Sequence, residues 1–420
     1  MSVPVLPERL AQAVVPGPVL AVLQGLEARG HRAFLVGGCV RDLLRGTAPK
    51  DWDVATSATP QQVQGCFPKV LPTGIQHGTV TVMSRGTPVE VTTFRVEGAY
   101  VDGRRPETVS FRTDVVEDLS RRDFTINAMA FSPTRGELVD PFDGRGDLER
   151  RLVRAVGDAT ARFSEDGLRA LRAVRFATVL DFTLDAATGE AIPGTLPVFR
   201  KVSIERVREE FQKILMSPRA PLGLRDLRDV GLLAEFLPAL AASPALHGAR
   251  TALAFAPPAL EVRLAALLLA SSEDVRAQVL HLRFPNRTAD LAGLLAAEAR
   301  TGVPDCPDAQ SLRRLLARLR LDNVEPLCAL VACRAAVDGR SQEALAFAGR
   351  LRAEAAKHPP LDARALALNG GAIMQALGVG PSPVVGVATR FLVDRVLEDP
   401  TLNTPERLSL LLRDWAAASR

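Results

Sequence analysis

Hydrophobic and polar residues follow two different patterns along the chain. Up to about residue 150, short apolar runs rich in β-branched residues alternate with amphipathic segments, which is typical of a mixed α/β sheet domain. Beyond that point apolar residues recur every three or four positions, as in SIERVREEFQKIL and RLSLLLRDWAAA. We therefore predict an α/β head at 1–150 followed by an all-α neck, body and tail at 151–220, 221–300 and 301–420.

The same pattern predicts individual elements of the head. One helix ends at Gly30, and another begins at Thr59 and Pro60, because Thr is a good N-cap and Pro suits the first helical turn. The runs LPTGIQHGTVTVM and TPVEVTTF are separated by a turn at 84–88, so we expect a hairpin of the same sheet. Residues 95–112 are rich in glycine and charge, and we expect a mobile loop there.

One stretch, FLVGGCVRDLLRGTAPKDWD, combines two glycines, an arginine and two carboxylates. Gly37 and Gly38 allow the backbone to approach a ligand closely, and a helix opening just after them would direct free N–H groups at an anion. Arg41, one turn into that helix, could bind the same phosphates. Asp51 and Asp53 then project from one face of the next strand. Either motif alone is usually a turn or a solvated strand end, but together they predict a phosphate cradle beside a metal site.

A third carboxylate belongs to the same predicted site. Glu90 lies between Val89 and Val91 on a short strand, where a carboxylate needs a reason to face inward. Acting as a third metal ligand, with Asp51 and Asp53, supplies that reason. Oxygen ligands beside a phosphate cradle are what Mg²⁺ uses when it bridges a protein to a triphosphate, so we expect Mg²⁺ as the cofactor.

Two later segments add polar groups with possible roles at this site. RRDFTINA brings together Arg121, Arg122, Asp123 and Asn127, a set with too many donors to be buried without partners, although a solvated helix start is the simpler alternative. The segment EDGLRALRAVRF predicts a helix with Ser164 as its N-cap and acidic residues in the first turn.

That helix carries a pair with two possible interpretations. Asp166 and Arg169, three residues apart, form either an ordinary intrahelical ion pair or a pair that reads a base. A carboxylate accepts from the exocyclic amine of cytosine or adenine, and a guanidinium donates to the adjacent ring nitrogen, whereas uracil and guanine present a carbonyl and an N–H there. Arg172 and Arg175 continue along the helix, and we expect them to be further nucleotide or phosphate contacts.

Composition limits the class of protein. A chain of 420 residues with 47% hydrophobic and 24% charged residues is typical of a globular protein of more than one domain. No apolar run reaches the roughly 18–20 residues of a membrane span, and MSVPVLPERLAQAVV lacks the pattern of a secretory signal, so we expect a cytoplasmic protein with no membrane partner. Five cysteines without a CxxC pair argue against a disulfide framework or a zinc site. The net charge of +4 permits RNA binding without requiring it, and the oligomeric state is left open.

The motifs GGxVRD, DWD, RRDFTINA and EDGLRALRAVRF occur in the order seen in class II tRNA nucleotidyltransferases, the CCA-adding enzymes, which are relatives of the bacterial poly(A) polymerases. The chain resembles this family over about residues 20–220. The resemblance implies a polymerase-β-like head and Mg²⁺-dependent, template-independent addition of C and A from CTP and ATP to the 3′ end of tRNA. It also implies that Arg122, Asp123 and Asn127 contact the incoming nucleotide and that the EDGLRALRAVRF helix replaces a nucleic-acid template.

Three alternatives stay open. An enzyme that adds only the terminal A shares these motifs, and the loop at 95–112 argues only against relatives that add CC alone. A poly(A) polymerase is disfavoured because the Gly-Arg-Arg-Phe stretch expected after the DxD strand is missing, and a non-catalytic RNA-binding scaffold is disfavoured by the intact set of three carboxylates. Leu269 and Ala270 stand where some relatives carry the His-Asp pair of a metal phosphohydrolase, so we expect no such second activity.

The tail contains one basic helix. SLRRLLARLR places Arg313, Arg314, Arg318 and Arg320 around a row of leucines. The simpler interpretation is a solvated basic face over a leucine core. The family resemblance adds the alternative that this face touches the tRNA backbone, where recognition would depend on shape and phosphate contacts.

Overall fold

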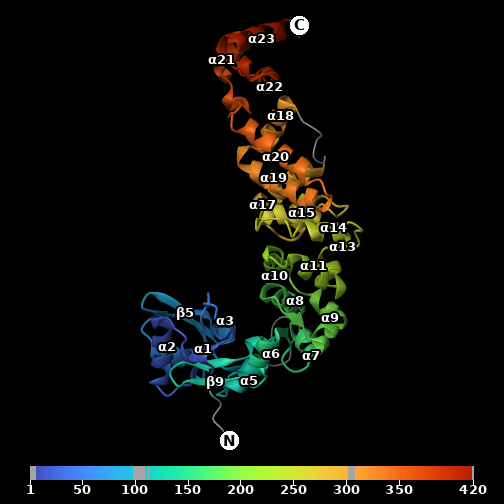
Figure 1. Cartoon of the computed structure of the whole chain (residues 1–420). Coiled ribbons are helices and arrows are strands. Elements are labelled where there is room, and N and C mark those ends of the chain that lie inside the picture. The colour runs from blue at the N-terminus through green and yellow to red at the C-terminus, as the bar shows by residue number, and fades with distance from the viewer. Residues whose placement is uncertain (1–5, 98–108, 112, 301–307, 419–420) are drawn as a thin grey trace. The chain divides into compact units, whose positions relative to one another are not determined.

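The computed structural model describes residues 6–97, 109–111, 113–300 and 308–418. The chain divides into two compact units, Met1–Pro238 and Ala239–Arg420 (Figure 1). The α/β head followed by helices is as predicted. The predicted boundaries near 150 and 220 both fall inside the first unit, and the boundary near 300 falls inside the second. Among the described residues, no helix is long and apolar enough to cross a membrane.

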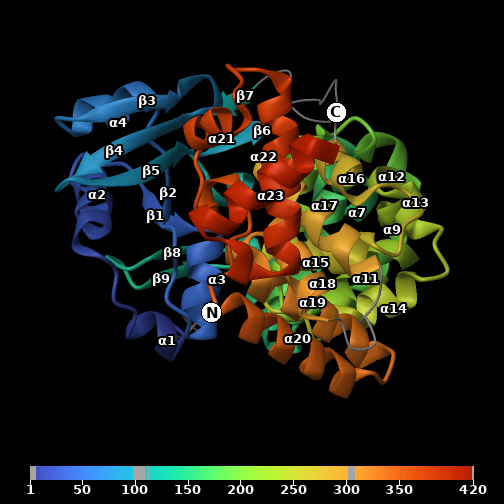
Figure 2. The ribbon, with the colours of Figure 1, turned by 90° about the horizontal axis from the view of Figure 1, so that it is seen from above.

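A seven-stranded sheet forms the centre of the head, with the order β3-β4-β5-β2-β1-β8-β9 (Figure 2). Its strands are β1 (Ala33–Val36), β2 (Asp53–Thr56), β3 (Val70–Gly74), β4 (Thr79–Ser84), β5 (Thr87–Thr93), β8 (Ala130–Ser132) and β9 (Glu137–Val139). The predicted hairpin is confirmed as the antiparallel pair β4–β5. Strands β2 and β5 pair in parallel, and their register sets Asp53 directly beside Glu90.

Helices cover the two faces of this sheet. On one face α2 (Gly17–Glu27), α3 (Gly38–Arg45) and α4 (Pro60–Cys66) bury an apolar core with Val54 and Val91. The predicted start of α4 is confirmed, because Thr59 and Gln62 form a capping box. On the other face Phe34 and Phe94 pack with the short helix α5 (Val115–Ser120). The short α1 (Glu8–Ala11) contacts α3.

The predicted mobile loop at 95–112 needs a correction at its two ends. Arg95–Glu97 forms β6 and Val109–Phe111 forms β7, and the two strands pair antiparallel. Residues 98–108, the middle of the predicted loop, lie outside the described residues.

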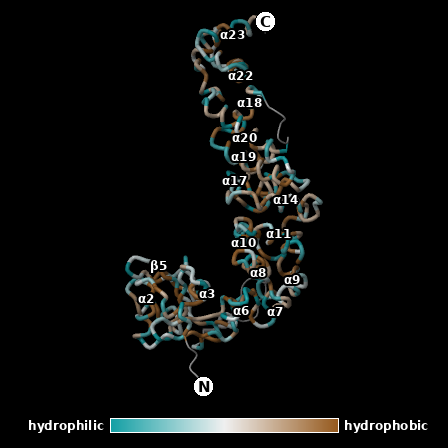
Figure 3. Tube along the Cα trace, viewed as in Figure 1, coloured by the Kyte–Doolittle hydropathy of each residue, from teal (hydrophilic) through white to brown (hydrophobic). Residues whose placement is uncertain are grey.

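The first unit continues as a short 3₁₀ turn and a run of helices with one small two-stranded sheet. These elements are η2 (Thr125–Asn127), α6 (Gly144–Arg150), β10 (Leu152–Val153), α7 (Ala159–Glu165), α8 (Leu168–Leu180), β11 (Thr183–Leu184), α9 (Ala186–Phe199), α10 (Ile204–Met216), α11 (Ala220–Asp229) and α12 (Leu232–Phe236). Hydrophobic and hydrophilic residues alternate along the helices of each unit in Figure 3, as the helical period predicts.

The single helix expected from Ser164 onward is wrong. Ser164 lies near the end of α7, and the chain is extended at Asp166 before α8 begins at Leu168. The residue after the break, Gly167, approaches α9 so closely that an added Cβ would lie 2.6 Å from the Phe199 backbone, so only glycine fits there. The Asp166 carboxylate accepts from the Leu168 N–H at 3.0 Å and so satisfies one free donor at the start of α8.

The second unit is helical wherever it is described. Its helices are α13 (Pro238–Ala241), α14 (Leu246–Ala252), α15 (Leu260–Leu268), α16 (Val275–His281), α17 (Asn286–Arg300), α18 (Ala309–Leu319), α19 (Val324–Val337), α20 (Ser341–Ala355), α21 (Gly370–Leu377), α22 (Pro383–Glu398) and α23 (Pro405–Ala418). A separate apolar cluster that includes Leu392, Val396 and Leu408 holds α21, α22 and α23 together.

The basic helix of the predicted tail, α18, is not a uniformly solvated face. Arg313 is 7% exposed, and its guanidinium donates to Glu354 at 2.9 Å and to the Leu397 and Glu398 carbonyls at 2.6 and 2.5 Å. It therefore caps the carboxyl end of α22. Arg314 and Arg318 are exposed, and they pair with acidic side chains of the same unit.

Candidate active site

Two carboxylates meet on the face of the sheet opposite to the core that contains Val54 and Val91. Asp53 is the first residue of β2, and its neighbour in the register is Glu90 of β5. Val89 and Val91 face the core, so Glu90 faces the opposite, exposed side, and the expectation of an inward-facing Glu90 is wrong. Trp52 packs against the core, as expected for the residue between two aspartates of one face.

The three carboxylates predicted to hold the metal are not gathered into one group in the described residues, and their role as metal ligands remains a prediction. In the described part of the chain, no group of three or more His, Cys, Asp and Glu side chains is placed to hold a metal ion. Asp51 precedes β2, and its charge acts on Asp53, whereas the charge acting on Glu90 is that of Asp53. Asp53 is therefore the central carboxylate, with Asp51 and Glu90 as separate neighbours.

Electrostatics at Asp53 favour a bound cation. Partial burial raises the pKa of Asp53, Arg122 lowers it, and the Asp51 charge raises it further. Partial burial and the Asp53 charge also raise the pKa of Glu90. Among the described residues, neither carboxylate takes part in an ion pair or a side-chain hydrogen bond. A hard divalent cation with oxygen ligands fits this donor set, because its charge would replace the missing counter-charge.

The Gly-Gly pair lies where the predicted phosphate cradle needs it. Gly37 has φ = 75° and directly precedes α3, which begins at Gly38. A Cβ at Gly37 would lie 2.9 Å from Nη1 of Arg122, so glycine leaves room for that guanidinium. The first N–H groups of α3 and the side chains of Arg41 and Arg122 therefore lie around one point, close to Asp53.

A chain of hydrogen bonds links α3 to α8. Arg41 Nη1 donates to Asn127 Oδ1 at 2.8 Å, and Asn127 Nδ2 donates to Asp123 Oδ1 at 3.1 Å. Arg172 then donates to Asp123 Oδ2 from Nε at 2.8 Å and from Nη2 at 2.6 Å. Burial would raise the pKa of Asp123, but Arg172 and Asn127 lower it to about 2. The structure thus joins four predicted site residues in one network.

Asp166 and Arg169 do not pair with each other. Arg206 of α10 donates to both carboxylate oxygens of Asp166, at 3.2 and 2.7 Å. Arg169 instead pairs with Glu165 and donates to the Arg121 carbonyl at 3.1 Å. The intrahelical ion pair considered from the sequence is therefore wrong, because the break before α8 turns the two side chains to different partners.

Arg175, another predicted nucleotide contact, already has an ion-pair partner inside the protein. Its side chain is buried and donates to Glu210 at 2.7 Å. Its role as a further nucleotide contact remains a prediction, and the ion pair leaves it less available than Arg172, which is one-third exposed.

Sequence reasoning missed an aromatic residue beneath the arginines. The Phe176 ring is buried, and the guanidinium carbons of Arg41, Arg172 and Arg175 lie 5.4, 5.5 and 3.4 Å from its centroid. Phe124 packs edge-on against the same ring, and the two ring centroids lie 5.6 Å apart. The only signal was the Phe that ends RAVRF, which an amphipathic pattern assigns to the core.

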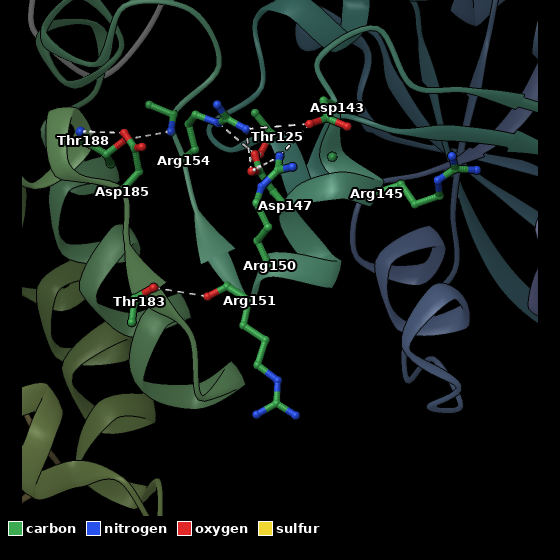
Figure 4. Close-up of polar contacts among 12 residues, drawn as sticks. Thr125, Asp143, Arg145, Asp147, Arg150, Arg151, Arg154, Thr183, Asp185 and Thr188 are labelled. Atoms are coloured by element: carbon green, nitrogen blue, oxygen red, sulfur yellow. Dashed lines mark hydrogen bonds and ion pairs between the residues drawn. The ribbon is translucent and has the colours of Figure 1, made fainter.

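A second buried carboxylate fixes the turn that carries Asn127. Asp147 is fully buried, and it accepts from Thr125 Oγ1 at 2.6 Å, from Arg150 at 2.8 Å and from Arg154 Nε at 2.9 Å (Figure 4). Because Thr125 begins η2, these contacts hold that turn against α6 and the strand that follows it.

The fold and the site define the chain as a nucleotidyltransferase of the poly(A) polymerase type. Residues 33–154 match the poly(A) polymerase head domain, and residues 181–243 match the probable RNA- and SrmB-binding site of polymerase A. The chain belongs to the family of CCA-adding enzymes. Enzymes of this family use a divalent metal ion.

Similarity to some members of the family extends over almost the whole chain, and to others over about half of it. The CCA-adding enzyme of Geobacillus kaustophilus is 39% identical over 93% of this chain and 94% of its own length. That of Lactobacillus delbrueckii subsp. bulgaricus is 49% identical over 51% of this chain and 54% of its own length. The structure of the Bacillus stearothermophilus enzyme in complex with CTP is 33% identical, with a TM-score of 0.80, covering 96% of this chain and 99% of that one.

Proposed function

We propose that this protein adds C and A from CTP and ATP to the 3′ end of tRNA, releases pyrophosphate, and depends on Mg²⁺. The observation that carries the proposal is the full-length similarity to CCA-adding enzymes, including one solved with CTP. The site geometry supports it, because a carboxylate pair lies beside a glycine-rich helix start and two arginines. The cytoplasm, where tRNA is available, is the proposed location.

Asp53 is the central residue proposed to hold the metal, with Asp51 and Glu90 beside it. When bound there, Mg²⁺ supplies positive charge that lowers the pKa of the attacking 3′-hydroxyl and neutralises the leaving pyrophosphate. Because Mg²⁺ commonly uses one or two carboxylates plus phosphate oxygens, the absence of a complete three-carboxylate set among the described residues fits a site completed by the nucleotide.

The triphosphate is proposed to lie at the start of α3. Gly37 and Gly38 leave the backbone N–H groups accessible, and Arg122 lies against Gly37 and near Asp53. Arg41 lies one turn further along α3, and its guanidinium donates a hydrogen bond to Asn127. The Arg122 guanidinium can bind phosphate oxygens bidentately while the carboxylates hold the metal. Arg41 pairs with Asp42 at 2.9 Å and would exchange this partner for a phosphate oxygen.

Asp166 and Arg169 are proposed to read the base. The Asp166 carboxylate is oriented by two bonds from Arg206 and one from the Leu168 N–H, and a carboxylate has about four acceptor positions, so one remains for an exocyclic amine. Arg169 is oriented by Glu165 and by the Arg121 carbonyl. Cytosine and adenine offer an exocyclic amine beside a ring acceptor at this edge, whereas uracil and guanine present a carbonyl beside an N–H at the same positions.

A related function is addition of the terminal A alone. Incubating the protein with tRNA that lacks the whole CCA end, and separately with tRNA ending in CC, each with CTP or ATP, distinguishes the two. We expect CTP to extend the first tRNA by two nucleotides and ATP to extend the second by one. Extension of the second tRNA alone would assign A-only activity. Long A tracts on either would assign poly(A) polymerase activity, and no incorporation on any end would favour an RNA-binding scaffold.

A further inference from the structure

A third buried carboxylate, Asp118 on α5, joins several groups of the candidate site. Its side chain is fully buried. Oδ1 accepts from Nε and Nη2 of Arg121 at 3.0 and 2.7 Å and from the Arg95 N–H at 3.3 Å, while Oδ2 accepts from Arg122 Nη2 at 3.3 Å. One carboxylate therefore binds two successive arginines and the first residue of β6.

Arg121 and Arg122 connect Asp118 to groups that are proposed to bind the nucleotide. Arg122 lies against Gly37 and lowers the pKa of Asp53, so its guanidinium lies between Asp118 and the proposed metal site. The carbonyl of Arg121 accepts from Nη2 of Arg169, the arginine proposed to read the base. The turn at the end of α5 thus sets the position of a phosphate-binding group and of a base-reading group together.

Arg122 has few other restraints. Among the described residues, Asp118 is the one side chain that accepts a hydrogen bond from its guanidinium, and its buried Nε has no partner. A long side chain with one anchor has several accessible rotamers once that anchor is lost. The orientation of the Arg122 side chain toward Gly37 and Asp53 therefore depends on the negative charge of Asp118.

We propose that Asp118 is a positioning residue for nucleotide selection, which directs Arg122 toward the triphosphate and fixes the turn whose carbonyl orients Arg169. This inference rests on the proposed nucleotidyltransferase function. Asp118 touches neither nucleotide nor metal, and it acts through the two arginines. A residue that only stabilises the head would change unfolding without changing how tightly the nucleotide binds.

The test is Asp118→Asn, assayed with CTP, ATP and UTP on a tRNA lacking its CCA end. We expect the KM for CTP and ATP to rise roughly tenfold or more, because a charge-assisted contact to the phosphates is lost, while the KM for tRNA stays within about twofold. The preference for CTP over UTP falls as well, because the turn beneath Arg169 loosens. Assays are run below the unfolding temperature of each variant, measured in parallel.

The matched control is Glu354→Gln, which alters a buried carboxylate paired with Arg313 and Lys357 in the second unit. It is expected to lower the unfolding temperature and leave the KM for nucleotides unchanged. Nucleotide KM values that are unchanged in Asp118→Asn, or that rise equally in Glu354→Gln, would overturn the role proposed for Asp118.

A second variant covers the case in which Asp118→Asn does not fold. Asp118→Glu keeps the charge and displaces it by one methylene, and the same rise in nucleotide KM is expected from the folded protein. An unchanged KM in this variant contradicts the proposal. Wild-type protein is assayed alongside, and if it incorporates no nucleotide into any tRNA end, the proposed function fails rather than the role of Asp118.

Discussion

At the residue scale, Asp53 is placed where its charge is disfavoured by the fold. Partial burial and the neighbouring Asp51 raise its pKa, and Arg122 compensates only in part. A carboxyl group whose pKa is raised by folding contributes stability below its unfolded pKa, and this contribution is lost as the pH rises through the folded pKa. At neutral pH the ionised Asp53 therefore costs stability, which is typical of a functional residue.

Replacing Asp53 with Asn is expected to separate stability from activity. Without divalent cations at pH 7, the variant should be slightly more stable than wild type, by less than about 0.5 kcal/mol, because Asp53 is exposed and solvent screens most of its disfavoured charge. Incorporation of nucleotides should be abolished, while tRNA affinity stays within a few-fold. Urea unfolding and a filter-binding assay measure the two effects.

The same variant tests the metal site without an activity assay. Mg²⁺ that binds the native site raises the unfolding temperature of wild-type protein by mass action, and this rise should shrink in Asp53→Asn. An equal rise in both proteins would show that Asp53 does not hold the ion.

Replacing Asp166 with Ala tests the base-reading proposal. If one carboxylate oxygen accepts from the exocyclic amine, the variant should lose roughly 1–3 kcal/mol of discrimination, or one to two decades in the ratio of CTP to UTP incorporation. The residual reaction should still require Mg²⁺. Asp226→Ala is a suitable control, because Asp226 pairs with the adjacent Arg225 on α11. A CTP to UTP ratio equal to wild type would mean that Asp166 only anchors Arg206.

Sequence reasoning predicted which residues lie near one another better than it predicted their hydrogen-bond partners. Gly37, Gly38, Arg41 and Asp53 were predicted because strand, glycine pair and helix follow one another within one short stretch. The bond from Arg206 to Asp166 joins residues 40 positions apart, and nothing local in the sequence encodes it. Asp118 was missed although its two arginine partners lie only three and four residues further along the chain, because its burial becomes visible only when α5 packs on the sheet.

At the scale of the elements, helix α18 shows how an amphipathic pattern can assign the wrong environment to a charge. Leu312, Leu316 and Leu319 are buried, as the period predicts. Arg313, next to Leu312, falls on the polar side of the helix, yet it inserts between α20 and the end of α22. The spacing of apolar residues shows which face of a helix is apolar. It does not show that the end of another helix covers the polar face.

Replacing Arg313 with Met is expected to destabilise the second unit by about 3–5 kcal/mol, because Glu354 and two helix-end carbonyls lose their buried partner. Replacing the exposed Arg314 and Arg318 with Gln should change stability by less than about 0.5 kcal/mol each. Urea unfolding measures both.

The same helix bears on RNA binding. The double variant Arg314→Gln, Arg318→Gln should leave the salt dependence of tRNA affinity unchanged if their ion pairs are only structural. A slope reduced by about one unit per arginine would instead assign them to phosphate contacts.

At the scale of the whole molecule, the order of elements was predictable and the division into units was not. The change from short β-branched runs to a helical period marks the end of the head correctly. The change of pattern predicted a boundary near 150, and further boundaries were predicted near 220 and 300, whereas the two compact units meet at Pro238, inside the predicted body. Helices α7 to α12 pack within the same compact unit as the sheet, and such long-range packing leaves no local compositional mark.

The parallel pairing of β2 with β5 also governs when the carboxylate pair can form. Helix α4 and strands β3 and β4 lie between the two partners in the chain, so a long loop must close before Asp53 meets Glu90. Loop closure costs conformational entropy before the contact offers any gain, which makes such non-local pairing slow. A nascent chain that has emerged only as far as β4 already carries Asp53 but has no β5 to place beside it. The pair of Asp53 and Glu90 therefore forms only when the β4–β5 hairpin docks against β2, after the glycine pair and α3 have been synthesised.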